Sequence, residues 1–467
     1  MLSFSKRVLL PSIAASFAMV YGLRAYRFLG SLGFRLSFGG VAQGVVACAV
    51  LIVGANVMNN KLHITSYIAK GTQEYGELYE SHYAISSELA RLDSSHPQNL
   101  IIILAESLES TFSNGGGGES PSQAPFGEAI PRLSSLAQKH INFSPTHAIG
   151  GLVQVAGTGW TMAGTIAHLC GIPLTMPIGG NSFSNKYFLD SALCVSDVLA
   201  NHGYTQAYLS GLDSSFAGMK YFLQSHAISV LDLPYFQQTG AIPSPLPQEL
   251  QGFWGLKDSR LFALARDMLP TLKEPFALYV STIDTHHPDG FVDPHACASV
   301  RSDYQGSFTC TDMLIAEFID YAQSLYGDSV SIVVVGDHLS MKTGFFPPNV
   351  SRYVFDLFIN PKFTAPYTLE STKSRTLSHF DIAPLLLDSV GIRTEAFGLG
   401  RNPLYKPTLL ESTFSQEELN ALIAQKSRMY DSFWDIGQKS YNLIKPKLEP
   451  SPINQTQKPR RDNDKTP

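Results

Sequence analysis

NLIIILAE, at residues 99–106, is a short apolar run that ends in a single carboxylate, Glu106. Two further runs have the same form, FALYVSTID at 276–284 and SIVVVGDH at 331–338. Runs of this length, rich in branched aliphatic residues, predict buried β-strands. Helical patterns separate them, so we expect an α/β domain with a mainly parallel central sheet. Weaker strand candidates lie at 206–211 and 354–360, and a helix starting near Asp381 and ending at Gly391 is expected within 378–392.

Polar side chains follow each of the three strong strands at the point where the strand ends. They are Glu106 after the first, Asp284, His286 and His287 after the second, and Asp337 and His338 after the third. Ligands of open α/β sheets bind beyond the carboxyl ends of the strands, so these side chains should converge on one site. Any one of them could instead cap a helix or close a turn. The coincidence at three strand ends favours a site.

The side chains expected at this site have the chemistry of a divalent-cation centre. Carboxylates combined with imidazoles suit Mn²⁺ or Zn²⁺, whereas an all-oxygen set would suit Mg²⁺ or Ca²⁺. We therefore expect a divalent metal cofactor at the strand ends.

A threonine between two glycines, Thr158 in QVAGTGWTMAG (154–164), is the candidate nucleophile. The following residues predict a helix that begins at or just after Thr158, where the helix dipole would favour an alkoxide and an incoming phosphate. The alternative is that Thr158 is only a helix N-cap. Thr161 and Thr165 are weaker candidates, because hydroxyls further into a helix tend to bond to backbone carbonyls.

The N-terminal part of the chain contains two uncharged stretches, Val8 to Leu23 and Leu36 to Asn60, separated by a loop with three arginines. The second is long enough to cross a bilayer as a helix. The arginine loop predicts that the residues after Asn60 lie outside the membrane, although Lys6 and Arg7 oppose this orientation for the first stretch. A buried helix or a signal peptide is the alternative, and the shorter first stretch also suits an interfacial helix.

Charge and cysteine content restrict the function further. The 34 basic and 39 acidic residues give a net charge of -5, which does not favour binding to nucleic acid. One of the five cysteines, Cys48, lies in the second apolar stretch. The other four suit two disulfides in an oxidising compartment, and sequence proximity suggests Cys170–Cys194 and Cys297–Cys310 among the three possible pairings.

The chain therefore divides into five expected segments. They are a membrane anchor at 1–60, a helical connector at 61–97, a catalytic domain at 98–405, a C-terminal helical segment at 406–445 and a disordered tail at 446–467.

Several blocks, taken in order, resemble the bacterial phosphoglycerol transferases of the sulfatase and alkaline phosphatase superfamily. The blocks are LAESLEST, GTGWTMAGTIAHLCGIPL, FWGLKD (253–258), DTHHPDG and VVVGDHLSM. The similarity covers roughly residues 98 to 400. It is greatest to the phosphoglycerol transferase I type, which modifies periplasmic glucans, and the lipoteichoic acid synthases are more distant relatives.

The resemblance implies an enzyme of the bacterial inner membrane whose catalytic domain lies on the periplasmic side. It would transfer phosphoglycerol from phosphatidylglycerol to a glycan acceptor through a covalent intermediate on a threonine, using a divalent metal such as Mn²⁺, with Mg²⁺ or Zn²⁺ as alternatives. Carried over by position, the metal ligands are Glu106, Thr158, Asp337 and His338, the catalytic residues are Thr158 and His286, and the substrate-binding residues are Trp254, Lys257, Asp258 and His287. His379, in SHFDIAP, is expected to be structural.

Three other functions remain as alternatives. A phosphoethanolamine transferase acting on lipid A or a glycan would use the same nucleophile and metal with a different donor. A hydrolytic sulfatase is disfavoured, because the sequence has no CxPSR-like stretch. A membrane-anchored binding protein could have kept the fold and lost the chemistry.

Overall fold

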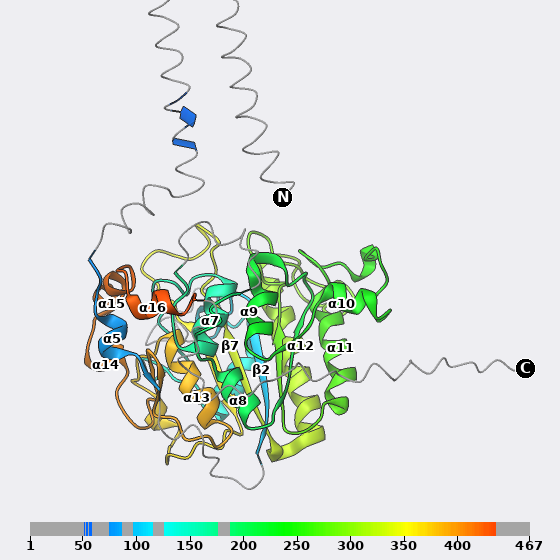
Figure 1. Ribbon diagram of the computed structural model, residues 1–467. Helices are drawn as coiled ribbons and strands as arrows, with labels where there is room; N and C mark the ends of the chain where they lie inside the picture. Colours follow the sequence, from blue (N-terminus) through cyan, green and yellow to red (C-terminus); the bar gives the residue numbers. More distant parts are fainter. Residues whose placement is uncertain are drawn as a thin grey trace, which may run out of the picture. The chain divides into compact units, whose positions relative to one another are not determined.

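The computed structural model describes residues 51, 53–54, 56–57, 74–85, 97–114, 126–175 and 187–435. The chain divides into two units, one comprising 1–73 with 176–180 and the other 74–175 with 181–467. The described helices and strands from Leu78 onward belong to the second unit (Figure 1). Most of the predicted membrane anchor and all of the predicted tail lie outside the described residues. Among the residues that are described, no helix has both the length and the apolar character needed to span a bilayer.

A seven-stranded sheet forms the centre of this unit. All five predicted strands are present, and the sheet is mixed. The strands β7, β2, β6, β4 and β5 run parallel, whereas β8 is antiparallel to β7. A parallel pairing of β7 and β8 would need a crossover connection, usually a helix, and the described loop between these two strands contains no helix. In spatial order the strands are β3 (Gly151–Leu152), β8 (Val354–Ile359), β7 (Val330–Gly336), β2 (Asn99–Ala105), β6 (Phe276–Ser281), β4 (Thr205–Ser210) and β5 (Ser229–Leu231).

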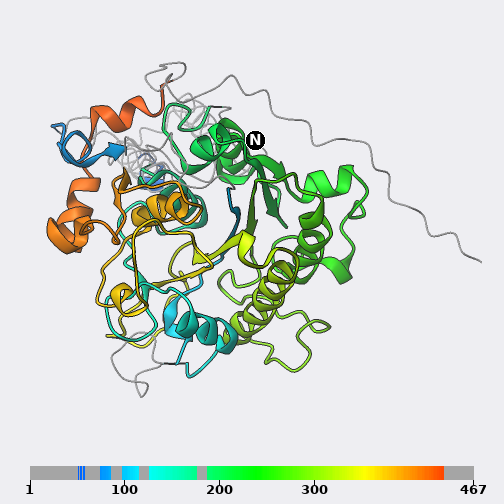
Figure 2. The same cartoon turned by 90° about the horizontal axis from the view of Figure 1, so that it is seen from below.

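Helices cover both faces of the sheet, as Figures 1 and 2 show. Every residue of β2, β6, β7 and β8 is buried, which explains why these strands are apolar without alternation. One face packs against α6 (Pro131–Lys139), α11 (Asp258–Met268) and α12 (Tyr304–Tyr326). The other lies under α7 (Thr161–Cys170), α8 (Val195–Asn201) and α13 (Ile382–Asp388), with α9 (Met219–Ser225) next to β5.

The parallel register of the central strands determines where the site lies. Ala105 of β2 is opposite Gly336 of β7, and Leu104 is opposite Ser281 of β6. The next residues of the three strands therefore leave the sheet at the same level. This places Glu106 and Asp337 side by side at the carboxyl edge.

The predicted connector helix is only partly correct. A short helix, α5 (Leu78–His82), is followed at once by the strand β1 (Ala84–Ile85), so the prediction of a helix through 61–97 is wrong at 84–85. β1 pairs with β9 (Ala396–Gly398), which pairs with β10 (Gly400–Arg401), and Tyr79 packs on Tyr430 with 5.3 Å between ring centroids. The helix α5 thus packs against α16 (Arg428–Ser432), the last of three C-terminal helices, which follows α14 (Leu409–Ser412) and α15 (Gln416–Ile423).

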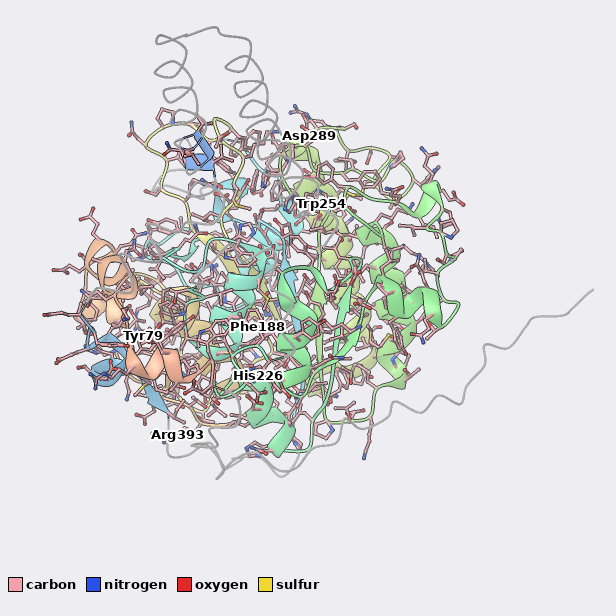
Figure 3. The ribbon with its side chains drawn as sticks, turned by 45° about the horizontal axis from the view of Figure 1, so that its top comes forward. Tyr79, Phe188, His226, Trp254, Asp289 and Arg393 are labelled. Carbon is pink, nitrogen blue, oxygen red and sulfur yellow. A yellow bond between two sulfur atoms is a disulfide. The ribbon has the colours of Figure 1, made fainter. Side chains whose placement is uncertain are left out.

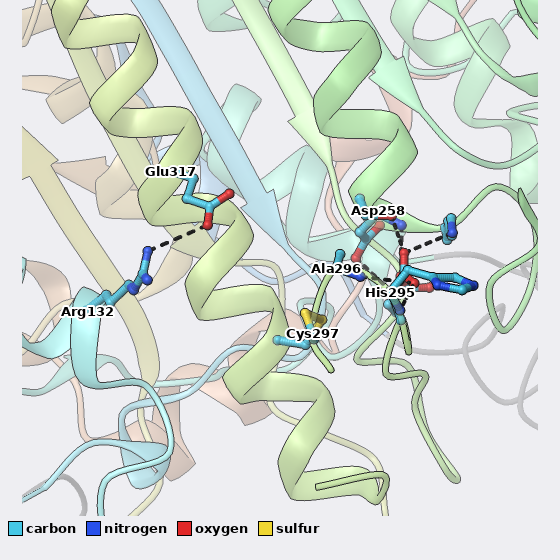
Figure 4. Close-up of a disulfide and its surroundings, with 11 residues drawn as sticks. Arg132, Asp258, His295, Ala296, Cys297 and Glu317 are labelled. Carbon is cyan, nitrogen blue, oxygen red and sulfur yellow. Dashed lines mark hydrogen bonds and ion pairs between the residues drawn. A yellow bond between two sulfur atoms is a disulfide. The ribbon is translucent and has the colours of Figure 1, made fainter. Parts of the chain in front are cut away.

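Two disulfides are present, with the pairing that sequence proximity suggests. Cys170–Cys194 joins the last residue of α7 to the N-cap of α8. Cys297–Cys310 joins the loop after β6 to α12 (Figure 4). The helix predicted within 378–392 is also confirmed, as a 3₁₀ turn at His379–Asp381 that continues into α13.

Candidate active site

The carboxyl ends of β2 and β7 bring together three of the predicted metal ligands. The Nε2 atom of His338 lies 3.5 Å from Oε1 of Glu106 and 3.6 Å from Oδ2 of Asp337. All three side chains are buried, and their ligand atoms lie close enough to hold one ion. The convergence expected at the strand ends is therefore present for these residues.

Two atoms of this cluster point to a cation. Oδ2 of Asp337 and Nε2 of His338 are both buried, and neither has a hydrogen-bond partner among the described residues. The Nδ1 atom of His338 lies 2.8 Å from the carbonyl of Leu339 and donates its hydrogen there, which leaves a lone pair on Nε2. A lone pair that faces two carboxylates is electrostatically unfavourable unless a proton or a metal cation lies between them. Burial opposes protonation of His338, but the charges of Asp337 and Glu106 outweigh it and raise the pKa of this imidazole. The position therefore favours positive charge. Two carboxylates and one imidazole are suitable ligands for Mn²⁺ or Zn²⁺.

The pKa shifts of the two carboxyl groups have opposite directions. Burial raises the pKa of Asp337 to about 7, and the negative charge of Glu106 adds to this effect. Burial also opposes ionisation of Glu106, but the charges of His338 and His286 and two hydrogen bonds hold its pKa below the usual value. Near neutral pH a divalent cation would therefore compete with a proton on Asp337.

Ser107 links the two carboxylates, and the sequence interpretation missed it. Its backbone N–H donates to Oδ1 of Asp337 at 2.8 Å, and its hydroxyl donates to Oε1 of Glu106 at 2.6 Å. Its φ of 54° is in the left-handed region, which is uncommon for a residue with a side chain. A serine after a strand has no distinguishing pattern, so only the backbone geometry identifies it. The hydroxyls of Thr282 and Thr285 also bond to the backbone of Glu106.

The helix carrying the candidate nucleophile begins at Thr161, so the prediction of a start at or just after Thr158 is wrong by about one turn. Gly157 has a φ of 75° and Trp160 is extended, so these residues form a turn before the helix. Thr158 is fully buried in this turn, where its hydroxyl donates to the carbonyl of Val155 at 2.8 Å.

Thr161 is the threonine that contacts the cluster. Its Oγ1 donates to Oε2 of Glu106 at 3.1 Å, and its side chain is half-buried. It is the first residue of α7, whose N-terminus has no side-chain cap, so the positive end of the helix dipole is close to this hydroxyl. Thr165 bonds to the carbonyl of Thr161 at 2.8 Å, as expected for a hydroxyl inside a helix.

Close packing of α7 against β7 depends on Gly164. A Cβ atom at this position would lie 1.9 Å from the carbonyl oxygen of Asp337. Glycine is therefore the only residue that fits without movement of the backbone that carries the cluster.

His286 packs against an exposed aromatic side chain, and its charge acts on Glu106 of the cluster. Its ring centroid is 4.7 Å from that of Trp254, whose side chain is 53% exposed, and 4.7 Å from that of His287. The Nδ1 atom of His286 is 2.6 Å from the carbonyl of His287, so Nε2 is available for proton transfer. Burial lowers the pKa of His287, and the neighbouring charge of His286 lowers it further. Trp254 and Asp289 lie at the same end of the molecule in Figure 3.

Asp258 and Lys257 differ from the predicted substrate contacts. The carboxylate of Asp258 is fully buried and accepts hydrogen bonds from the backbone of Ile283 and Asp284 at 3.0 and 2.9 Å. Burial raises its pKa to about 7. Lys257 forms an ion pair with Asp293 at 3.0 Å, and the carbonyl of Asp293 accepts a hydrogen bond from the backbone N–H of Cys297 at 2.9 Å. Both side chains support the segment that carries His286.

An ion pair between the buried Glu109 and the half-buried Arg352 holds the loop that follows His338. Arg352 donates two hydrogen bonds to Glu109, at 2.8 and 2.6 Å, and its guanidinium lies 3.6 Å from the ring centroid of Phe346. Glu109 also accepts from the backbone of Ser340 at 3.1 Å. Sequence reasoning missed this pair, although Glu109 follows Glu106 by three residues in LAESLEST.

A second group with possible metal ligands consists of Cys194, Asp197 and His226. The sulfur of Cys194 is bonded to Cys170, so it offers no thiolate. Asp197 accepts hydrogen bonds from Nδ1 of His226 at 2.8 Å and from the backbone of Cys194 at 2.9 Å. The arrangement is that of a buried hydrogen-bonded pair beside a disulfide.

Comparison with known proteins places this site in a family. The family model described as Sulfatase matches residues 98–392. The chain belongs to the sulfatase family. One similar protein is phosphoglycerol transferase I from Xanthomonas axonopodis pv. citri, which is 34% identical over 258 residues. This match covers 52% of the present chain and 34% of the Xanthomonas protein. The present chain is 31% identical to phosphoglycerol transferase I from Salmonella choleraesuis, over 68% of this chain and 41% of that one. The chain thus spans less than half the length of these relatives.

One solved structure that matches is the lipoteichoic acid synthase LtaP from Listeria monocytogenes, with 16% sequence identity and a TM-score of 0.49. The match covers 70% of the present chain and 81% of the LtaP chain. The Streptococcus pyogenes phosphoglycerol transferase GacH has 14% sequence identity and a TM-score of 0.41, and the match covers 77% of the present chain and 91% of the GacH chain.

Proposed function

We propose that this chain transfers phosphoglycerol from phosphatidylglycerol to a glycan hydroxyl through a covalent intermediate on Thr161. The observation that carries the proposal is the hydrogen bond between the Thr161 hydroxyl and Glu106, which places a nucleophile on the candidate metal cluster. The curated relatives named phosphoglycerol transferase I support the nature of the transferred group.

Thr161 replaces Thr158 as the proposed nucleophile. Thr158 is fully buried and its hydroxyl is engaged by a carbonyl within its own turn, so an incoming phosphodiester has no route to it. Thr161 is half-buried, begins the helix and lies on the cluster. These features favour an activated hydroxyl.

The proposed metal ligands are Glu106, Asp337 and His338 with the hydroxyl of Thr161. A divalent cation held there would act as a Lewis acid on the phosphoryl oxygens and lower the pKa of the hydroxyl. Mn²⁺ is the proposed ion, because the donor set mixes carboxylate and imidazole.

In the first step the Thr161 oxygen attacks phosphorus and the bond from phosphorus to the diacylglycerol oxygen breaks. Glu106 is the nearest described acceptor for the hydroxyl proton, and Nε2 of His286, when protonated, supplies a proton to the leaving oxygen. In the second step His286 takes the proton of the acceptor hydroxyl, whose oxygen attacks phosphorus. The bond from phosphorus to the Thr161 oxygen breaks, and Glu106 returns its proton to that oxygen. Ring contact with His286 makes Trp254 the proposed apolar wall for the glycerol or sugar.

The membrane is the proposed source of the donor. The uncharged stretch Leu36 to Asn60 would anchor the chain in the inner membrane of a bacterium, with the catalytic unit on the periplasmic side. The two disulfides suit such an oxidising compartment.

The test uses the full chain in detergent, supplied with phosphatidylglycerol that is labelled in its glycerol head group. The proposal expects diacylglycerol release and label on the protein, both lost in Thr161→Ala and after chelation. A parallel reaction with labelled phosphatidylethanolamine separates the alternative transferase. Transfer of the ethanolamine label alone would overturn the proposed donor, and label retained in Thr161→Ala would overturn the proposed nucleophile.

A further inference from the structure

One face of α7 is directed at the carboxyl ends of β2 and β7. Thr161, Gly164 and His168 are spaced by three and four residues and therefore lie on the same side of the helix. Thr161 contacts Glu106, Gly164 abuts the carbonyl of Asp337, and His168 reaches the carbonyl of Gly336. The helix that carries the proposed nucleophile thus packs directly against the strand end that carries two proposed metal ligands.

Two fully buried histidines meet at this strand end. The rings of His168 and His379 are stacked, with centroids 4.9 Å apart and an interplanar angle of 16°. Nε2 of His168 is 2.9 Å from the carbonyl oxygen of Gly336, and Nε2 of His379 is 3.1 Å from that of Asp337. Nδ1 of His168 also lies near a carbonyl, that of His379, at the longer distance of 3.4 Å. A neutral imidazole has one N–H, and we assign it to the shorter contact, with Gly336 for His168 and with Asp337 for His379.

The two carbonyls lie where the ladder between β2 and β7 ends. The last paired residues are Ala105 and Gly336, and the N–H of Ser107, which continues the chain from β2, donates to the side chain of Asp337 instead. Buried carbonyls beyond a ladder need other donors. His168 and His379 supply them, from two helical segments on the same side of the sheet.

We infer that His168 and His379 are positioning residues that fix the backbone at Gly336 and Asp337 and thereby set the geometry of the metal cluster. The side chains of Asp337 and His338 leave the backbone at these peptides, so a rotated carbonyl would move both ligand atoms. Residues that orient metal ligands in this way commonly change metal affinity about 10- to 100-fold when they are replaced. The inference rests on the proposed metal cluster but not on the identity of the donor or acceptor.

The test is isothermal titration of the full chain with Mn²⁺, using matched amide replacements. Glutamine carries its amide nitrogen near the position of Nε2, whereas the shorter asparagine does not reach it. We expect His379→Gln and His168→Gln to bind Mn²⁺ within about threefold of wild type and His379→Asn and His168→Asn to bind it about tenfold or more weakly. A thermal melt of each variant confirms that it is folded at the titration temperature.

His226→Gln is the control, because His226 is also fully buried but pairs with Asp197 away from the cluster. It should lower the melting temperature and leave Mn²⁺ affinity unchanged. If the folded asparagine variants bind Mn²⁺ as tightly as wild type, the positioning role of the two histidines is overturned, but the proposal that the cluster binds a metal is not. If wild type binds no Mn²⁺ or other divalent ion, the proposed cluster fails and the inference fails with it. Should an asparagine variant not fold, a glutamine variant with affinity lowered about tenfold at the same site would also contradict the inference.

Discussion

The hydroxyl of Thr161 and the carboxylate of Glu106 are joined by a 3.1 Å hydrogen bond between the start of α7 and the end of β2. This contact joins the N-terminus of α7, the proposed nucleophile and a candidate metal ligand at one point.

Replacement of the two threonines should have different consequences. Thr161→Ala should lower the rate of diacylglycerol release by about three orders of magnitude or more, because a covalent pathway loses its nucleophile. Thr158→Val should lower stability by about 1 kcal/mol, through loss of one buried hydrogen bond, and leave the rate within a few-fold. Rates on labelled phosphatidylglycerol and urea unfolding measure the two effects. The reverse pattern would restore Thr158 as the nucleophile.

Gly164→Ala should be destabilising although alanine is the better helix former. In an ordinary helix interior this change stabilises by about 1 kcal/mol. Here the new methyl group would overlap the carbonyl of Asp337, so we expect a lower melting temperature and weaker Mn²⁺ binding. Thermal melts with and without Mn²⁺ test this, and a stabilised variant with normal affinity would show that α7 is not in tight contact with β7.

Metal affinity should depend on pH through Asp337. Burial raises the pKa of this carboxyl group to about 7, and a ligand must lose its proton before it binds a cation. Below about pH 7 the apparent affinity for Mn²⁺ should therefore fall about tenfold per pH unit, and above it the affinity should level off. Titration calorimetry between about pH 6 and pH 8 measures this. Asp337→Asn is the control, and an equal affinity for Mn²⁺ at all pH values in wild type would contradict the assignment of Asp337 as a ligand.

The Glu109–Arg352 pair should contribute more to stability than an exposed pair does. Arg352→Met leaves a buried carboxylate without its cation, which destabilises by about 3 kcal/mol. Lys406→Met removes one partner of Glu395 from a surface pair and should change stability by less than about 1 kcal/mol. Urea unfolding of both variants gives the comparison. Equal effects would mean that the loop after His338 does not depend on this ion pair.

The core of the fold was predictable from the sequence, because the central strands are buried on both faces. Such strands appear as unbroken apolar runs, and the residue after each run is the first one free to be polar, as Glu106 and Asp337 are. The antiparallel β8 could not be foreseen from its composition, since direction depends on the connection and not on the strand. The strand at Ala84–Ile85 was missed because its pairing partner is more than three hundred residues away.

The site was predictable only at the level of strand ends. Which threonine contacts Glu106 depends on a helix start that differs from the predicted one by about one turn, after a turn that the left-handed Gly157 makes possible. The positions of Ser107 and His379 depend on backbone conformation and on contacts between distant segments. No local pattern in the sequence reports either feature.

The most direct test of the central claim is to locate the covalent intermediate. The full chain is mixed with phosphatidylglycerol in the absence of acceptor, quenched in acid, digested and mapped by mass spectrometry. We expect one glycerophosphoryl group on Thr161, absent from Thr161→Ala and present in Thr158→Val. Turnover of the donor with the modification on Thr158, or with no modified threonine under single-turnover conditions, would contradict the account.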